Sequence, residues 1–368
     1  MNSDILENLT DPAVLFFFLG IVVGLIRSNL EVPAPVAKFL SLYLLMALGF
    51  KGGQELSKAG LSGEGAKVLG AAIFLALVIP GIWFLFLRKR INSFDAAAIA
   101  ATYGSVSAVT FVTASQFVAA RGDEAGGHMT VALALMESPA IIMAVFLATW
   151  VRSRLSAESL KESEIAITIP VSPANLEARA LIPESDHAAG ARPSEENHSH
   201  SGTQPISVKE VLREAFTDGA HLLLIGSMVI GAISGEKGGE VMAPFVGGMF
   251  KGFLAFFLLE MGLLVARQLR EVRDVGPFLI GFGAIVPFVN AALAMTIGWA
   301  LGLDVGDLTL LTVLAASGSY IVVPAVVRYA IPEARPSRYL TLALAVTFPI
   351  NMAIGIPLYY AIASAISG

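Results

Sequence analysis

Long apolar runs separated by short polar turns set the pattern of the chain. Stretches such as LLMALGF (44–50), AAIFLALVIPGIWFLFL (71–87) and AIIMAVFLATWV (140–151) are too long and too apolar to be single faces of soluble helices. A bilayer-spanning helix needs about 20 mostly apolar residues, whereas membrane β-barrels show alternating segments of about ten. The pattern therefore predicts an all-α polytopic membrane protein. Ten transmembrane helices are expected, near residues 12–27, 34–53, 66–87, 95–119, 129–151, 218–234, 243–266, 275–301, 307–328 and 338–366.

A polar segment divides these helices into five plus five. Residues 153–208 are rich in Glu, Ser, Pro, Ala and His, and low hydrophobicity with many turn formers predicts a disordered linker. The expected organisation is a first five-helix repeat over 1–152, the linker over 153–208, and a second five-helix repeat over 209–368.

The two halves carry related sequences. DAAAIAATYGSVSAV (95–109) aligns with DLTLLTVLAASGSYI (307–321), and LYLLMALGFKGGQEL (42–56) aligns with AFFLLEMGLLVARQL (255–269). Pro139 in the fifth span likewise matches Pro349 in the tenth. Because each half has an odd number of spans, the halves must be inverted in the membrane. Inverted repeats are a common construction of secondary transporters.

Composition narrows the function. Hydrophobic residues make up 55% of the chain and charged residues 14%, against about 25% charged in soluble domains. With a mean hydropathy of +0.74, this excludes an ordinary cytosolic enzyme, a nucleic-acid binder and a disordered chain. The chain has no cysteine, no G-x-x-x-x-G-K-[ST] motif and no convincing nucleophile, base and acid constellation. We therefore expect no enzyme activity, no direct use of ATP and no cofactor.

Lys and Arg predict the orientation, because cytoplasmic loops carry an excess of them. One face has Arg27, Lys38, Arg88, Lys89, Arg90, Arg267, Arg270, Arg273, Arg328, Arg335 and Arg338. The other has Lys51, Lys58, Lys67, Arg121, Lys237 and Lys251. The first face should be cytoplasmic, with the linker on it and both termini outside. The expected location is the cell inner membrane.

Two matched motifs near mid-membrane are candidates for a binding site. GSVSAVT (104–110) and SGSYIVVP (317–324) contain residues that weaken helices, so the fourth and ninth helices are expected to be broken there. Free amide groups at the start of a half-helix suit an anion, and free carbonyls and hydroxyls suit sodium. The alternative is that these small residues only allow close helix packing. The candidate substrate-binding residues are Gly104, Ser105, Val106, Ser107, Thr110, Gly318, Ser319 and Tyr320.

Polar side chains at membrane depth add candidates, since they are costly there unless functional. Glu137 in the fifth span is the first, with a packed protonated side chain or an interfacial anchor as the alternative. Glu260, Asn290 and Thr347 are further intramembrane polar residues. Asp95 and Asp307 are interpreted as helix caps. The candidate sodium ligands are Ser105, Ser107, Glu137, Ser317, Ser319 and Asn351.

Several of these motifs together resemble a known family. LLMALGFKGGQEL, FLLEMGL, GSVSAVT, MESPAI and the Ser-rich ninth span resemble the cyanobacterial sodium-dependent bicarbonate transporters and their wider bacterial superfamily. The resemblance implies a gate domain from helices 1, 2, 6 and 7 and a core domain from helices 3–5 and 8–10. It further implies homotrimers, elevator-type motion, bicarbonate and Na⁺ bound between the broken helices, and a PII-like cytoplasmic regulator.

The chain departs from the family pattern at the site. Ala108 and Val109 stand where the family has Gly and Ser, Tyr320 follows the ninth-span serines in place of Asp, and Glu137 replaces Asp. The predicted function is a sodium-coupled bicarbonate symporter. The alternatives are a sodium- or proton-coupled symporter of another small anion, with Glu137 carrying the proton, and a membrane anion sensor that signals through the linker.

Overall fold

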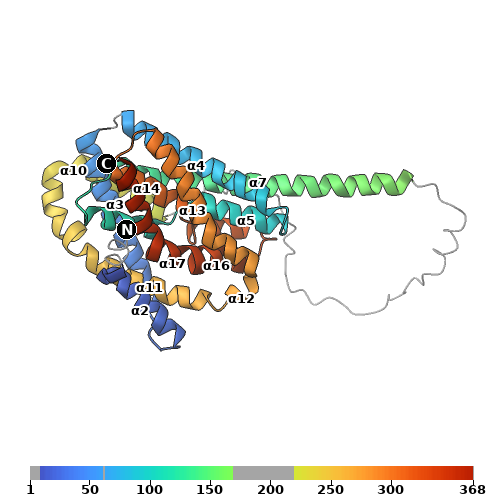
Figure 1. Cartoon of the computed structure of the whole chain (residues 1–368), viewed down its shortest axis with the longest axis horizontal. Coiled ribbons are helices and arrows are strands. Elements are labelled where there is room, and N and C mark those ends of the chain that lie inside the picture. Colours follow the sequence, from blue (N-terminus) through green and yellow to red (C-terminus); the bar gives the residue numbers. More distant parts are fainter. Residues whose placement is uncertain (1–8, 61–62, 169–218, 368) are drawn as a thin grey trace, which may run out of the picture.

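The computed structural model describes residues 9–60, 63–168 and 219–367. These residues form helices joined by short turns, with no strand among them (Figure 1). The prediction of an all-α chain is therefore confirmed over these ranges. Within them, seven helical segments are long and apolar enough to cross a membrane, and two shorter apolar helices accompany them.

Four helices form one packed group, which we call the gate group: α2 (Pro12–Leu25), α3 (Ala34–Ala59), α10 (Gly219–Ala243) and α11 (Phe250–Gln268). In this group α3 packs along α10, and α2 packs along α11. Glycine is required at the crossings: a Cβ on Gly53 would lie 1.9 Å from the carbonyl oxygen of Met228. A Cβ on Gly262 would lie 2.1 Å from the carbonyl oxygen of Phe17. Such small residues let membrane helices approach backbone to backbone.

The other long helices form a second group, the core group, around two interrupted helices. In this group α4 packs on α5 and α7, and α13 packs on α14. The bounds are α4 Gly63–Leu87, α5 Ser93–Gly104, α6 Ala108–Ala119, α7 His128–Thr168, α13 Pro277–Ala300, α14 Val305–Ala316, α15 Val322–Ala330, α16 Pro336–Thr341, η2 Leu342–Thr347, α17 Phe348–Ile350, η3 Asn351–Gly355 and α18 Ile356–Ser367. The short elements η1 (Pro244–Gly248) and α12 (Val272–Val275) precede and follow α11.

The predicted spans and the observed helices differ in three places. The first span, expected over 12–27, is a helix of only 14 residues. The spans expected over 218–234 and 243–266 lie in one apolar segment, Leu222–Gln268. Gly235 interrupts the helical conformation of this segment with a φ of +57°, which glycine adopts without steric cost.

The third difference is the end of the fifth span. Helix α7 continues to Thr168, so it enters the segment expected to be a linker from residue 153, and Figure 1 shows it projecting beyond the other helices. Its sequence SRLSAESLKESEIA (153–166) has no Gly or Pro and many helix-favouring residues. The rest of the predicted linker, 169–208, lies outside the described residues.

The helix caps also differ from expectation. Asn92 Oδ1 accepts a hydrogen bond from Phe94 N, and Asp304 Oδ1 accepts one from Asp307 N, each 2.8 Å long. These two residues are the N-caps of α5 and α14. The prediction that Asp95 and Asp307 are caps was therefore wrong: both lie three residues inside their helices, where the side chains are free to bond elsewhere.

Candidate functional site

Both helices expected to break are broken. Helix α5 ends at Gly104 and α6 begins at Ala108, while α14 ends at Ala316 and α15 begins at Val322. We call the intervening segments 105–107 and 317–321 the first and second break. Small hydroxyl residues favour this, because their side chains bond to nearby backbone groups and compete with the helix.

The two breaks are hydrogen-bonded to each other. Ser107 N donates to Ser317 Oγ over 3.0 Å, and Ser319 N donates to the carbonyl oxygen of Thr102 over 3.0 Å. Ser317 Oγ itself donates to Leu314 O. Residues about 210 positions apart thus meet in one buried centre, as the repeat alignment predicts.

Amide side chains satisfy the carbonyl groups that the end of α14 leaves without helical partners. Asn290 Nδ2 donates to Ala315 O over 3.1 Å, and Asn351 Nδ2 donates to Ala316 O over 2.9 Å. The Asn351 oxygen in turn accepts from Tyr359 OH. The candidate ligand Asn351 therefore supports the second break from behind.

The serines hold the starts of the second half-helices, Ser107 as the N-cap of α6 and Ser319 from two residues before the N-cap of α15. Ser107 Oγ accepts from Thr110 N and Thr110 Oγ1, at 3.2 and 2.9 Å, and donates to Tyr320 OH over 3.1 Å. Ser319 Oγ accepts from Val323 N over 3.3 Å. The hydroxyls thus hold the starts of α6 and α15, and Ser107 also joins the first break to Tyr320.

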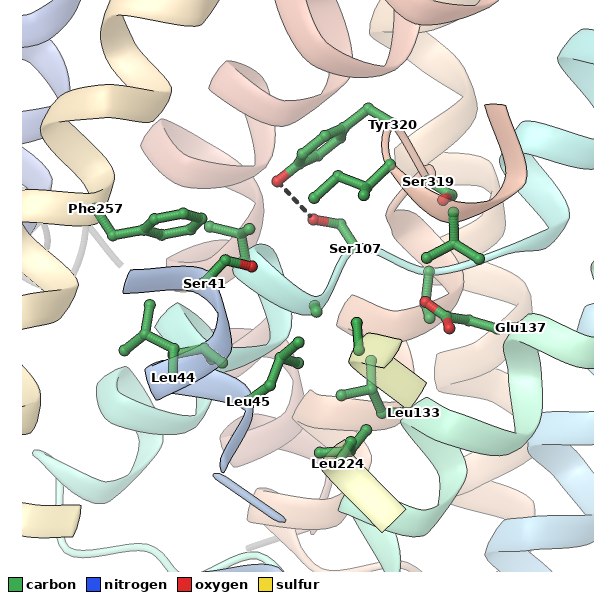
Figure 2. Close-up of a pocket in the computed structure, with 17 residues that line it drawn as sticks. Ser41, Leu44, Leu45, Ser107, Leu133, Glu137, Leu224, Phe257, Ser319 and Tyr320 are labelled. Atoms are coloured by element: carbon green, nitrogen blue, oxygen red, sulfur yellow. Dashed lines mark hydrogen bonds between the residues drawn. The ribbon is translucent and has the colours of Figure 1, made fainter. Parts of the chain in front are cut away.

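A cavity of about 70 Å³ lies between the gate group and the two breaks, and its lining is mostly apolar. A single water needs about 10–15 Å³ of such space, so a small ion with its water fits. Figure 2 shows Ser41 and Phe257 of the gate group on one side and Ser107, Ser319 and Tyr320 on the other. Of the predicted site residues, the cavity is lined by Val106, Ser107, Glu137, Ser319 and Tyr320.

Glu137 is the one carboxylate on this lining. It is 9% exposed, and Figure 2 shows its carboxylate turned from α7 toward the two breaks. The first amide groups of α6, at Ala108 and Val109, have no helical acceptor, and both residues line the same cavity. The cavity therefore brings together an acid, the four hydroxyl side chains of Ser41, Ser107, Ser319 and Tyr320, and the positive end of a helix dipole.

Other predicted site residues lie behind the cavity wall. Ser105 is 1% exposed and its hydroxyl has no hydrogen-bond partner, whereas Ser317 is used between the breaks. Gly104 packs against the ring of Pro80. The residues that do not line the cavity are Gly104, Ser105, Thr110, Ser317, Gly318 and Asn351. The sodium set is thus divided between the cavity and the layer behind it.

The other intramembrane polar residues are buried and mostly bonded. Asn290 accepts from Trp83 Nε1 over 2.8 Å, and Thr347 bonds to Tyr103 OH and to Gly283 O. Glu260, in α11, is 6% exposed with one oxygen unpartnered, and it lies away from this cavity. Within the described ranges no three His, Asp or Glu residues cluster as a metal site, so a cation here would rely on hydroxyls, carbonyls and Glu137.

Sequence reasoning missed the gate side of the cavity. Ser41 and Phe257 line it from α3 and α11, with Leu44, Leu45 and Leu224. Ser41 is a polar residue within an apolar run, which was a usable signal. The leucines and Phe257 gave no such signal, because apolar residues of the same types also face the lipid.

Comparison with known protein families places the chain. A model of the Na⁺-dependent bicarbonate transporter superfamily matches residues 12–364, nearly the whole chain. None of the curated proteins compared with the chain matches it. The matched region includes both breaks, the cavity and Glu137. The protein belongs to the Na⁺-dependent bicarbonate transporter superfamily.

Proposed function

We propose that this protein is a sodium-coupled bicarbonate symporter with elevator-type alternating access. The observation that carries the proposal is the cavity in which two repeat-related breaks and Glu137 meet. The family supplies the substrate class, and the residues at the cavity supply chemistry that suits it. Each role below is part of this proposal.

Bicarbonate is bound at the start of α6. The amide groups of Ala108 and Val109 lack helical acceptors, and the helix dipole adds a partial positive charge there. Such helix starts bind small anions without a cationic side chain. Tyr320 OH, held by Ser107 Oγ, is a further polar group at the same cavity.

Sodium is bound by oxygen atoms next to this anion. Glu137 supplies the negative charge, and Ser319 supplies a hydroxyl oxygen at the cavity. Ser107 Oγ joins them when Thr110 Oγ1 releases its hydrogen bond. Ser105 Oγ, buried without a hydrogen-bond partner, is a further free oxygen in the first break. Moving one charge across 100 mV is worth about 2.3 kcal/mol, so an anion entering a negative cell needs at least one cation for a neutral cycle.

The ten-helix inverted repeat is supported by the helix contacts. When each helix is replaced by its counterpart in the other half, one contacting pair of helices becomes another contacting pair. In span order, α2 and α3 are helices 1 and 2, and α10 and α11 are helices 6 and 7. The α3–α10 contact is then the image of the α11–α2 contact. In the same way α4–α5 corresponds to α13–α14. A pseudo-two-fold axis in the membrane plane produces such pairs.

Elevator motion is supported by where the cavities lie. The 70 Å³ cavity separates the gate group from the core group, as expected if one slides past the other. A second cavity of about 220 Å³ is lined by the same three helices, α3, α6 and α7, and lies about one helical turn from the first. Leu44 and Leu133 line the first cavity, and Leu48 and Met129 line the second. A thin apolar layer thus separates the site from an outer vestibule.

The orientation and assembly belong to the same proposal. The Lys and Arg asymmetry supports a cytoplasmic linker and external termini in the cell inner membrane. Homotrimers and a PII-like cytoplasmic regulator are supported by the family resemblance alone.

The test is uptake of radiolabelled bicarbonate into proteoliposomes, with an inward sodium gradient, an equal choline gradient, or a pH gradient alone. We expect uptake that requires sodium and reaches above equilibrium. Uptake that ignores sodium and follows the pH gradient would establish a proton-coupled carrier through Glu137 instead. No uptake of bicarbonate under any gradient, with uptake of another small anion, would correct the substrate.

A further inference from the structure

Two buried carboxylates in the core group make the same set of bonds in opposite halves of the chain. Asp95 in α5 accepts from Arg335 N at Oδ1, over 2.8 Å, and from Arg338 Nη1 at Oδ2, over 2.7 Å. Asp307 in α14 accepts from Gly126 N at Oδ1, over 2.8 Å, and from His128 Nε2 at Oδ2, over 2.5 Å. Each carboxylate thus binds one backbone amide and one side chain.

The partners come from the opposite repeat. Arg335 and Arg338 lie at the start of α16, which opens the last helical stretch of the second half. Gly126 and His128 lie at the start of α7, the last helix of the first half. The broken helix of each half is therefore tied to the last helix of the other half. Asp95 and Asp307 are 4% and 2% exposed, so neither pair is a surface ion pair.

We propose that Asp95 and Asp307 are positioning residues: each fixes the far end of a broken helix to the opposite repeat, and so keeps the two breaks in register at the transport site. The proposal rests on the transport function above, because the site that it positions is the one proposed there. Neither aspartate lines the cavity, so both act at a distance.

The geometry of the half-helices explains why a tie at this end matters. Helices α5 and α14 have 12 residues each, which is about 18 Å of helix. One end of each carries the aspartate and the other end opens into a break. No continuous backbone hydrogen bonding crosses the break, so a half-helix that tilts at its tied end displaces the break at its other end.

The tie on α14 is packed so tightly that two positions require glycine. A Cβ on Gly306, next to Asp307, would lie 2.2 Å from the carbonyl oxygen of Glu124. A Cβ on Gly126 would lie 2.2 Å from Cε1 of the His128 ring. The loop before α7 therefore rests directly on the first turn of α14.

The negative charge of the two carboxylates also contributes to the ties. Both aspartates lie in the first turn of their helix, where the dipole stabilises negative charge. Removing the charge leaves a buried amide and a buried cationic or imidazole group with a weaker acceptor. At Asp95 an asparagine of the same shape would present an amide donor to Arg338, which cannot accept, and at Asp307 it would keep the shape and remove the negative charge.

The experiment compares Asp307→Asn and Asp95→Asn with Asp304→Asn. Asp304 caps the same helix as Asp307, three residues earlier, and asparagine caps helices as well as aspartate does. We measure bicarbonate KM and the sodium concentration for half-maximal uptake in proteoliposomes, normalised to folded protein. We expect each tie variant to raise both values about fivefold or more, and the control to change them by less than twofold.

A second variant guards against misfolding. His128→Gln keeps Asp307 and its bond from Gly126 N but replaces the imidazole, and should raise the same two values about threefold. Because His128 and Asp307 act through one hydrogen-bonded pair, a variant with both His128→Gln and Asp307→Asn should raise the two values no further than Asp307→Asn alone. A loss of maximal rate in proportion to lost folded protein, with both values unchanged, would show a purely structural role and overturn the proposal.

Failure of the proposed function is distinguishable from failure of this inference. If the wild-type protein transports no bicarbonate, the function is wrong, and hydrogen exchange still tests the ties. Amide groups of residues 316–321 should then exchange at least threefold faster in Asp307→Asn than in Asp304→Asn. Equal exchange in the two variants would overturn the positioning role.

Discussion

The two breaks occupy matched positions in the repeats but are built differently. The first break has three residues, all buried, and Ser107 caps the helix that follows. The second has five residues, its following helix has no side-chain N-cap, and Ile321 is 54% exposed. The first break is therefore short and enclosed. The second is longer and is exposed to solvent or lipid at Ile321.

The glycine that precedes or lies within each break shows the same difference. A Cβ on Gly104 would lie 2.0 Å from Cγ of Pro80, a rigid ring within α4. A Cβ on Gly318 would meet Ala343 at 3.5 Å, which is ordinary contact. The two glycines thus carry opposite packing constraints, and a single added methyl group at each position tests them.

The largest effect is expected for Gly104→Ala. The added methyl group overlaps the Pro80 ring and forces α4 and α5 apart, which costs about 1–3 kcal/mol of stability and displaces the first break. Thermal unfolding in detergent and bicarbonate uptake measure the two consequences. Gly318→Ala is the matched variant, and we expect it to fold and to transport. Equal damage in both variants would remove the contrast between the breaks.

Next in size is Glu137→Gln, which tests the side chain that both breaks face. The glutamine keeps the shape and removes the charge, so a sodium ligand is weakened. We expect the sodium concentration for half-maximal uptake to rise tenfold or more, or uptake to be abolished, in protein that still folds. Sodium dependence identical to the wild type would show that Glu137 is not a ligand.

The third prediction compares the two serines. Loss of one hydroxyl ligand costs about 1 kcal/mol, which is about fivefold in affinity. Ser107 Oγ makes three hydrogen bonds and Ser319 Oγ makes one long bond. Ser107→Ala should therefore weaken both stability and sodium binding, and Ser319→Ala chiefly binding. Isothermal titration with sodium measures the affinity, and thermal unfolding measures the stability. Unchanged affinity in both variants would favour a packing role.

The smallest effect concerns the end of the second broken helix that lies away from the break. Arg152 donates to Ala330 O, at the end of α15, and to both oxygens of Glu333. Burial alone would raise the pKa of Glu333, but the hydrogen bonds and charge of Arg152 outweigh it and lower that pKa. This stabilisation is present above the pKa of an unfolded glutamate, about 4.3, and is lost as the pH falls through the lower folded value.

The variant Glu333→Gln measures the stabilisation that the pair of Arg152 and Glu333 contributes. Because both side chains are more than a third exposed, we expect a loss of less than about 1 kcal/mol at pH 7. The difference in melting temperature from the wild type should shrink as the pH falls below about 4. A difference that stays constant as the pH falls well below that value would show that the charge of Glu333 contributes nothing to α15.

Some of the site could be predicted from sequence, and the reason is local chemistry. Clustered Gly and Ser residues at mid-membrane depth weaken a helix, and the predicted motifs 104–110 and 317–324 contain both breaks. Glu137 was found because a carboxylate is costly in a membrane. The error at Asp95 and Asp307 had the opposite cause. A helix start rewards any nearby acid, and only the three-dimensional path of the opposite repeat shows that these two acids bind elsewhere.

The sequence by itself determined that the chain is helical and membrane-spanning and that two helices break near their centres. These properties depend on apolar length and on backbone preference, which are read residue by residue. Only the tertiary structure decided which predicted ligands reach the cavity and which lie behind its wall. It also decided that Ser41 and Phe257 face the site and that each broken helix is tied to the other half. Those outcomes depend on contacts between residues some 200 positions apart, and side-chain direction at such a contact is fixed only by packing.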